Sequence, residues 1–301
     1  MNNKQIFVGF SGNSAQHQFL DGSLGNKVGV IKRALFLEGS SINASREICR
    51  CGTSVHLNLL VSKSGTRDSG RFYLDQCLEK LPAGIQVEEL AVLEECHHSL
   101  VLHRSGEAQE HEILGFKGRI IDAHVEKVCE RIIPAANVAD LILLTSVRPA
   151  EIPFAKAALS AKKTAVVTLH RELLADVESL RVVLSNVSVV VVNQIEYKAL
   201  VDKGLDFAKI HALGVKLVVV TNRTSNGLFS HNGFLGDFEV KPIKCESDDG
   251  AGDVFTGALT AYLSEQDEAL SDVKICKQML NFAALRTRKA LLEKTTIMPI
   301  A

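Results

Sequence analysis

The chain has 301 residues, of which 46% are hydrophobic and 23% are charged, the balance of an ordinary globular protein. This composition excludes intrinsic disorder, collagen and coiled coil. The 34 basic residues nearly balance the 35 acidic ones, which argues against a nucleic-acid partner because such binders carry a basic excess or stripe. Seven cysteines without a CxxC pair indicate a reducing compartment. Since no apolar run approaches a membrane span, we predict a cytoplasmic protein without a membrane partner.

Short apolar runs rich in β-branched residues alternate with amphipathic stretches along most of the chain. The run SVVVV at Ser188–Val192 is apolar without alternation, as expected of a parallel strand covered on both faces. The predicted strands are 5–10, 54–61, 140–144, 164–169, 188–192 and 216–221. The predicted helices are 41–51, 70–80, 122–133, 152–161 and 195–201. Strand–helix–strand order predicts an α/β fold with a doubly wound, mostly parallel sheet flanked by helices.

One stretch departs from this alternation. Residues 99–104 and 109–114 alternate polar and apolar side chains around Ser105 and Gly106, which predicts a hairpin. The hairpin could be a lid over a site or a plain edge hairpin, and the sequence favours neither. We predict a single α/β domain over residues 1–301 with a small β lid around 97–116, to which residues 11–36 could contribute.

The segment most informative about chemistry begins at Gly250. Gly250, Ala251 and Gly252 are small and permit close approach to the backbone, and from Asp253 the apolar positions have helical spacing. A phosphate suits such a turn, because the first N–H groups of a helix have no internal partner and the helix dipole favours anions. Asp253 could take a proton from an attacking hydroxyl. The alternative is a helix whose first-turn carboxylate only complements the dipole.

At these residues the sequence resembles the ribokinase-like carbohydrate kinases, also called the PfkB family. Gly250–Asp253 (GAGD) matches the second family signature, D-T-x-G-A-G-D, with Ser247 and Asp248 in place of the usual Asp-Thr. The first signature, a glycine-rich turn followed by Asn, corresponds to Gly39 and Asn43. The resemblance covers about residues 5 to 290 in the family's order.

Features that the family uses for the nucleotide follow later in the chain. Asn193 and Glu196 match its N-x-x-E motif, and Thr221 and Gly227 match the first and last positions of its phosphate loop. Asn281 lies in a late helix that resembles the adenine-side helix. The resemblance thus assigns these five residues to the ATP side of the site.

The resemblance implies phosphoryl transfer from ATP, with Mg²⁺, to a hydroxyl of a sugar or sugar derivative. Asp253 would be the general base, and the backbone N–H groups of Gly250, Ala251 and Gly252 would form the anion hole. Asn193 and Glu196 would orient waters on Mg²⁺. The alternative for this pair is a capping box at a helix N-terminus.

The resemblance also bears on the phosphate acceptor. Gly39 and Asn43 would lie beside it, and Ser14 stands where sugar-binding relatives have an Asp that grips sugar hydroxyls. A serine cannot accept bidentate hydrogen bonds from a diol. We therefore expect poor use of free ribose or fructose and a different or modified acceptor.

Two other functions remain open at the level of sequence. Departures from the family pattern suggest a catalytically impaired member that binds a ligand as a sensor or regulator, and a nucleoside kinase is the alternative within the enzyme class. A homodimer through the lid is also compatible with the resemblance. The departures are Glu38, Ser62, Arg223 and Asp248.

Overall fold

A computed structural model describes residues 4–21, 29–63, 68–104, 111–222, 225–241, 243 and 250–293. Within these residues the larger sheet has nine strands in the order β13-β12-β11-β10-β9-β8-β1-β4-β5. All neighbours are parallel except β11–β12 and β12–β13, which are antiparallel. The strands are β1 (Gln5–Phe10), β4 (Ser54–Ser62), β5 (Ile85–Leu93), β8 (Leu141–Val147), β9 (Thr164–Leu169), β10 (Val189–Asn193), β11 (Leu217–Thr221), β12 (Gly227–His231) and β13 (Phe234–Phe238).

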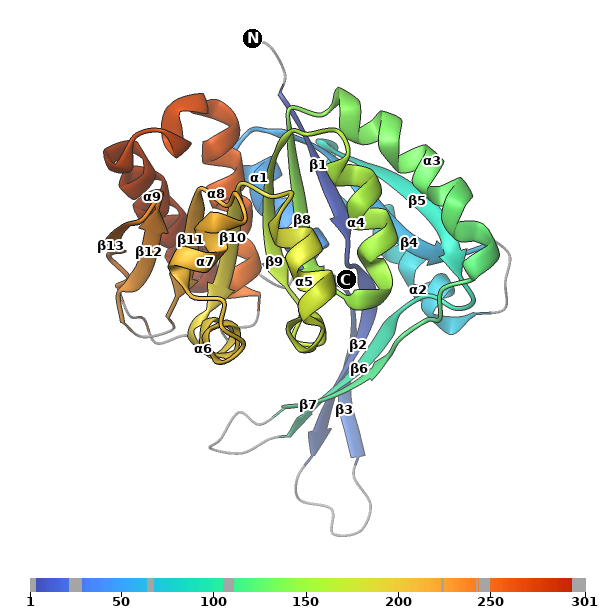
Figure 1. Cartoon of the computed structure of the whole chain (residues 1–301). Coiled ribbons are helices and arrows are strands. Elements are labelled where there is room, and N and C mark those ends of the chain that lie inside the picture. Colours follow the sequence, from blue (N-terminus) through green and yellow to red (C-terminus); the bar gives the residue numbers. More distant parts are fainter. Residues whose placement is uncertain are drawn as a thin grey trace.

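Helices cover both faces of this sheet (Figure 1). On one face lie α3 (Asp122–Val138), α4 (Ile152–Leu159), α5 (Val177–Leu184), α6 (Gln194–Asp202) and α7 (Phe207–Ala212). On the other lie α1 (Ser40–Arg50), α2 (Ser69–Leu78), α8 (Ala251–Glu265) and α9 (Val273–Leu292). Short 3₁₀ turns precede α4, α5 and α9. The predicted doubly wound, mostly parallel α/β fold is confirmed.

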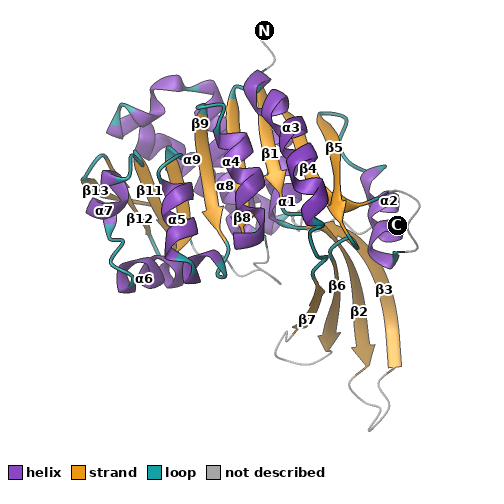
Figure 2. Cartoon of the chain, turned by 45° about the vertical axis from the view of Figure 1, so that its right-hand side comes forward, coloured by secondary structure: helices purple, strands orange, loops and turns teal. Residues whose placement is uncertain are grey.

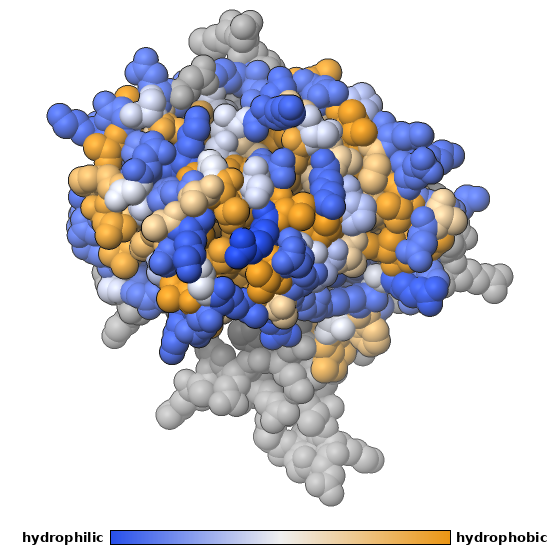
Figure 3. Space-filling view, viewed as in Figure 1, coloured by the Kyte–Doolittle hydropathy of each residue, from blue (hydrophilic) through white to orange (hydrophobic). Residues whose placement is uncertain are grey.

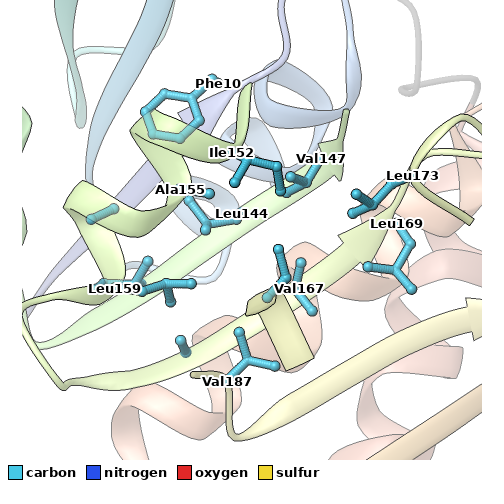
Figure 4. Close-up of a cluster of buried hydrophobic side chains, with 14 of the residues drawn as sticks. Phe10, Leu144, Val147, Ile152, Ala155, Leu159, Val167, Leu169, Leu173 and Val187 are labelled. Atoms are coloured by element: carbon cyan, nitrogen blue, oxygen red, sulfur yellow. The ribbon is translucent and has the colours of Figure 1, made fainter. Parts of the chain in front are cut away.

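The unbroken apolar runs of the strands are explained by this double covering. In β8, Ile142 and Leu144 pack in the core with α3 and α4, while Leu141 and Leu143 pack in the core with α1 and α8. Figure 4 shows part of the first core, where Leu144, Ile152 and Val167 converge between α4 and the strands. Because side chains of a strand alternate between faces, burial on both sides requires apolar residues at consecutive positions.

Some local predictions differ from the structure. The predicted helix 122–133 stops before Pro134, whereas α3 continues through it to Val138. A proline in a helix interior removes a backbone hydrogen bond, but Ile132 and Ala136 on either side are fully buried and hold the helix to the core. Strands β5, β12 and β13 and helices α5 and α7 were not predicted from the sequence.

A second sheet projects from one end of the body (Figures 1 and 2). Its described strands are β2 (Asn13–Asp21), β3 (Gly29–Glu38), β6 (His98–Arg104) and β7 (His111–Phe116), in the order β3-β2-β6-β7. The predicted hairpin is present as antiparallel β6–β7, with Leu100 opposite Leu114. Its turn, Ser105 and Gly106 included, lies outside the described residues. The small β element therefore draws on two distant segments of the chain.

The connectivity of the larger sheet defines where ligands are expected to bind. From β1 the chain adds β4 and β5 on one side, and then β8 to β13 on the other. In open α/β sheets, ligands bind at the carboxyl ends of the strands where the order reverses. Here that place is the edge formed by the ends of β1 and β8, from which the second sheet also departs.

The surface in the view of Figure 1 mixes hydrophilic and hydrophobic side chains (Figure 3). None of the helices in the described ranges has the length and apolarity needed to cross a bilayer.

Candidate active site

The N-terminus of α8 is built for close approach. Gly250 has φ 76°, in the left-handed region, and a Cβ on it would lie 3.1 Å from Asn43 Nδ2. A Cβ on Gly252 would meet nothing within 4 Å. The helix begins at Ala251, two residues before the predicted start, and places Asp253 in its first turn. The turn thus places the first N–H groups of the helix, which have no partner within the helix, beside a carboxylate.

The first turn of α1 faces this carboxylate. Gly39 precedes α1 with φ 112°, a conformation that glycine tolerates and other residues rarely adopt. Its carbonyl accepts hydrogen bonds from the N–H groups of Ile42 and Asn43, both at 3.0 Å. Asn43 Nδ2 then donates to Asp253 Oδ2 at 3.1 Å. Two signature motifs 210 residues apart therefore meet in one hydrogen bond.

Close packing of α1 on α8 makes this contact possible. Gly257 lies one turn after Asp253, and a Cβ on it would lie 2.6 Å from the carbonyl oxygen of Ala44. That distance is shorter than any ordinary van der Waals contact, so the two helices can approach this closely only with glycine at position 257. The small residue after the second signature therefore has a physical reason.

Hydroxyl groups join α1 to the switch-point edge. Ser41 Oγ lies 2.7 Å from Thr145 Oγ1, and Ser40 Oγ lies 2.9 Å from Ser146 Oγ. The N–H of Ser41 donates to the carbonyl of Ser11 at 3.0 Å. The start of α1 is thereby tied to the ends of β8 and β1. These serines were missed from the sequence, where the only signal is a pair of hydroxyl residues at the end of a predicted strand.

Burial dominates the electrostatics of Asp253. The loss of hydration raises the pKa of its carboxyl above the ordinary value, against the hydrogen bond from Asn43 that favours the ionised form. A carboxylate with a raised pKa holds a proton more strongly and is a better general base near neutral pH.

On the predicted nucleotide side, Asn193 and Glu196 form a capping box, the structural alternative to a role toward Mg²⁺. Asn193 Oδ1 accepts from the N–H of Glu196, and Glu196 Oε2 accepts from the N–H of Asn193, both at 2.9 Å. Burial raises the pKa of Glu196. The pair stabilises the start of α6, and its role toward Mg²⁺ stays a prediction.

Thr221 lies next to this pair. It ends β11 and stands opposite Asn193 in the register of β10 and β11. Its Oγ1 donates to the carbonyl of Val192 at 3.3 Å. The carboxyl ends of the two strands therefore bring Asn193 and Thr221 together, as parallel neighbours do.

Gly227 and Asn281 each have a local structural role. A Cβ on Gly227 would lie 2.0 Å from the ring of Phe238 on β13. Asn281 Oδ1, on α9, accepts from the N–H of Glu239 at 3.2 Å. Glycine at 227 is thus required for strand packing whether or not a phosphate binds nearby.

Three of the remaining motif positions lie on the strands β2, β3 and β4. Ser14 lies on β2, opposite Leu37 and His98, and its side chain is outside the described residues. Glu38 is the last residue of β3. Ser62 is buried and donates to Asp68 Oδ2 at 2.8 Å, so this departure from the family pattern serves a buried hydrogen bond. Arg223, Ser247 and Asp248 lie outside the described residues.

A charged cluster lies at the root of the second sheet, just after β8. Arg148 Nε donates to Glu151 Oε1 at 3.0 Å, and its Nη2 lies 2.8 Å from His97 Nε2. His97 Nδ1 accepts from the N–H of Gly118 at 2.8 Å. Burial, and to a smaller extent the positive charge of Arg148, lowers the pKa of His97 to about 3. His97 is therefore neutral and ties the end of β8 to the second sheet.

Comparison with solved structures identifies the scaffold. Phosphofructokinase-2 from Escherichia coli in complex with fructose-6-phosphate matches with a TM-score of 0.72 and 17% identity, over 96% of this chain and 94% of that one. Ribokinase from Arabidopsis thaliana complexed with ribose and ATP matches with a TM-score of 0.71 and 18% identity, over 97% and 93%. The chain has the ribokinase-like fold.

Proteins with the ribokinase-like fold that act on different acceptors match almost equally well. Nucleoside kinase from Burkholderia thailandensis in complex with inosine has a TM-score of 0.68 and 13% identity, over 95% of this chain and 91% of that one. No protein-family model matches the sequence, and no curated protein matches it significantly. The likeness is therefore one of fold, and the function is inferred from the site.

Proposed function

We propose that the protein is an ATP-dependent kinase that phosphorylates a hydroxyl of a sugar or sugar derivative, with Asp253 as the general base. The observation that carries the proposal is the hydrogen bond from Asn43 to Asp253 at the N-terminus of α8. It joins the two signature segments at the switch-point edge, beside the second sheet. A helix that merely placed a carboxylate on its dipole would need no such partner.

The chain's own groups suit this chemistry. The oxygen of the acceptor hydroxyl would form a bond to the γ-phosphorus while the bond from that phosphorus to the ADP oxygen breaks. Asp253 would accept the proton that the hydroxyl loses. The N–H groups of Gly250, Ala251 and Gly252 would face the charge on the transferred phosphoryl group. ATP, when bound, supplies that group. Phosphoryl transfer depends mainly on positioning and charge stabilisation, which a fixed carboxylate beside a helix N-terminus provides.

ATP and Mg²⁺ belong to the proposal through the residues at the ends of β10 and β11. The known structures with this fold include a fructokinase with bound ATP from Xylella fastidiosa. The fit of this chain to Mg²⁺ is indirect, because Asn193 and Glu196 each use an oxygen in the capping box. Mg²⁺ keeps several waters in protein sites, so the two side chains would hold it through water.

The second sheet would act as the lid of the single domain. Strand β2 follows β1 directly, and His97, just before β6, contacts Arg148, just after β8, so the second sheet would stand next to the acceptor side of the site. A homodimer through this sheet and a location in the cytoplasm complete the proposal.

The test is ATP turnover over an acceptor panel at fixed ATP and Mg²⁺. The panel contains ribose, fructose, sugar phosphates, sugar acids and nucleosides, with ADP formation as the readout. We expect turnover of a modified sugar and poor use of free ribose and fructose, since Ser14 replaces the diol-binding Asp. A kcat/KM of about 10⁴ M⁻¹s⁻¹ or above for free ribose or fructose would contradict this acceptor preference.

A nucleoside kinase is the second candidate, because nucleoside kinases are among the proteins whose structures match this chain. The same panel separates the two functions. An impaired, ligand-binding member would instead show thermal stabilisation by ATP and Mg²⁺ without ADP formation on any acceptor. The retention of Asp253 and its Asn43 partner supports activity over that alternative.

A further inference from the structure

The charged cluster at the root of the second sheet lacks one hydrogen-bond acceptor. His97 Nδ1 accepts from the N–H of Gly118 at 2.8 Å, and Arg148 Nη2 lies 2.8 Å from His97 Nε2. A neutral imidazole has one accepting nitrogen, and a guanidinium only donates. With Nδ1 as the acceptor, Nε2 carries the hydrogen, so two donors face each other. An oxygen from outside the cluster would give both of them a partner.

Arg148 is held in place by a buried carboxylate. Its Nε and its backbone N–H each donate to Glu151 at 3.0 Å, and its Nη2 donates to the same carboxylate. The Glu151 side chain is 1% exposed and that of Arg148 is 16% exposed. None of the described residues accepts a hydrogen bond from Nη1 of Arg148. The guanidinium is therefore already oriented, and a ligand that binds it has little ordering left to bring about.

Basic groups surround the ring of His97. After burial, the groups that lower its pKa are Arg148, Lys117 and His98, all of them basic. Lys117, just after β7, is itself paired with Glu172, and both of these side chains are about half exposed. A ring surrounded by basic groups lies in a positive potential, which favours an anion beside it.

The cluster lies beside the acceptor end of the proposed site. Ser146 Oγ, in the last turn of chain before Arg148, lies 2.9 Å from Ser40 Oγ at the start of α1. Asn43 of the same helix donates to Asp253. Arg148 follows Ser146 by two residues, so their Cα atoms are at most about 7 Å apart. An acceptor whose hydroxyl meets Asp253 could therefore extend toward Arg148 with its other end.

We propose that Arg148 and His97 form an anion subsite that selects an acceptor carrying a phosphate or carboxylate group. The inference rests on the proposed kinase function and deepens it by naming the class of acceptor. The anionic oxygens would accept from Nη1 and Nη2 of Arg148 and from Nε2–H of His97. Hydrogen bonds from a guanidinium to an oxyanion are among the strong ones. An anionic acceptor also fits the expectation that free ribose and free fructose are poor substrates.

The first test measures binding without ATP, by isothermal titration calorimetry with matched pairs of ligands. One pair is ribose 5-phosphate and ribose, and the other is gluconate and glucose. The charged member of at least one pair should bind about 10- to 100-fold more tightly than its neutral partner. The pair that shows the preference identifies the group as phosphate or carboxylate. Equal affinity within both pairs would overturn the inference.

Variants of Arg148 assign the preference to the cluster. Arg148→Lys keeps the positive charge but loses the planar fork, and it should lose most of the preference for the charged ligand. Removal of Arg148 alone would leave Glu151 buried and unpaired, which is strongly destabilising. The double variant Arg148→Gln/Glu151→Gln removes both charges together and should also lose the preference. Thermal unfolding checks that each variant is folded.

Arg131→Lys is the matched control. Arg131 lies on α3 and pairs with Glu88 on β5, away from the root of the second sheet. This variant should keep the full preference for the charged ligand. Retention of that preference in both Arg148 variants would overturn the inference.

The outcomes separate this inference from the proposed function. Equal ADP formation on neutral and charged acceptors, unchanged in Arg148→Lys, would refute the subsite and leave the kinase assignment in place. Binding of the charged ligand that depends on Arg148, without ADP formation on any acceptor, would refute the kinase assignment and support the anion subsite.

Discussion

The two halves of the candidate site are held in different ways. On the acceptor side, Asn43 and Asp253 contact each other across elements that are far apart in sequence. On the predicted nucleotide side, three of the motif residues have a local structural role: Asn193 and Glu196 cap α6, and Gly227 packs against the ring of Phe238. The difference separates motif residues that have a purely structural role from motif residues whose contacts need another explanation. Contacts between distant motifs argue for a site, whereas local caps and close packing would be present in any stable domain.

The largest expected effect is a loss of turnover on substitution of Asp253, on the acceptor side. Asp253→Asn keeps the size of the side chain but removes the base, so turnover should fall by roughly 10²–10⁴ with folding retained. Steady-state kinetics and thermal unfolding measure the two quantities. Asp122→Asn is the matched control, because Asp122 is also a first-turn carboxylate, on α3, and should leave turnover unchanged. Near-normal turnover of the Asp253 variant would remove the base from the proposal.

The next effect concerns packing on the nucleotide side. Gly227→Ala places a Cβ where the Phe238 ring now lies, and overpacking of this kind costs about 1–3 kcal/mol. Denaturant unfolding should show the loss. Gly115→Ala is the control on another strand, since a Cβ there meets nothing within 4 Å. An unchanged free energy of unfolding together with weaker ATP binding would mean that Gly227 serves the phosphate loop and not the packing.

A third effect depends on pH and concerns the root of the second sheet. His97 has an ordinary pKa of 6.5 when unfolded and about 3 when folded, so between these values the unfolded state binds the additional proton. Stability should therefore fall as the pH drops from about 6.5 toward 3, by about 1.4 kcal/mol per pH unit for one proton. Unfolding of His97→Gln at several pH values should give a shallower slope.

Replacement of His124, which is exposed on α3, removes a histidine without touching the root of the second sheet. This control should keep the slope of the unmodified protein. Equal slopes for His97→Gln and the unmodified protein would show that His97 is not held neutral by burial.

The smallest effect tests whether Asn193 and Glu196 only cap α6. If Asn193 and Glu196 act toward Mg²⁺ through water, Glu196→Gln should raise the Mg²⁺ concentration needed for half-maximal turnover. If they only cap α6, the variant should lose of order 1 kcal/mol of stability with the same Mg²⁺ dependence. Asp206→Asn, at the N-cap of α7, is the control for a cap without a metal role. It should change stability and leave the Mg²⁺ dependence of turnover unchanged.

Much of the fold could be predicted from the sequence, because each central strand carries its own signal. The bounds of β1 and β9 agree with the prediction, and β10 differs by one residue at each end. The edge strand β5 was not predicted: it pairs with β4 at the edge of the described sheet, and Glu88 and Glu89 interrupt its apolar pattern. Strand β3 pairs with β2, and β2 pairs with β6 of a hairpin about 80 residues away, a pairing that no local pattern reveals.

The same division applies to the site. The sequence by itself determined that a glycine-rich turn opens α8 with a carboxylate in its first turn, because helical spacing and small residues are local properties. Only the tertiary structure decided that Asn43 reaches Asp253 and that Ser40 reaches Ser146, over separations of 210 and 106 residues. The physical reason is that parallel strands bring their carboxyl ends to one edge, where polar side chains from distant segments are desolvated together and must satisfy one another.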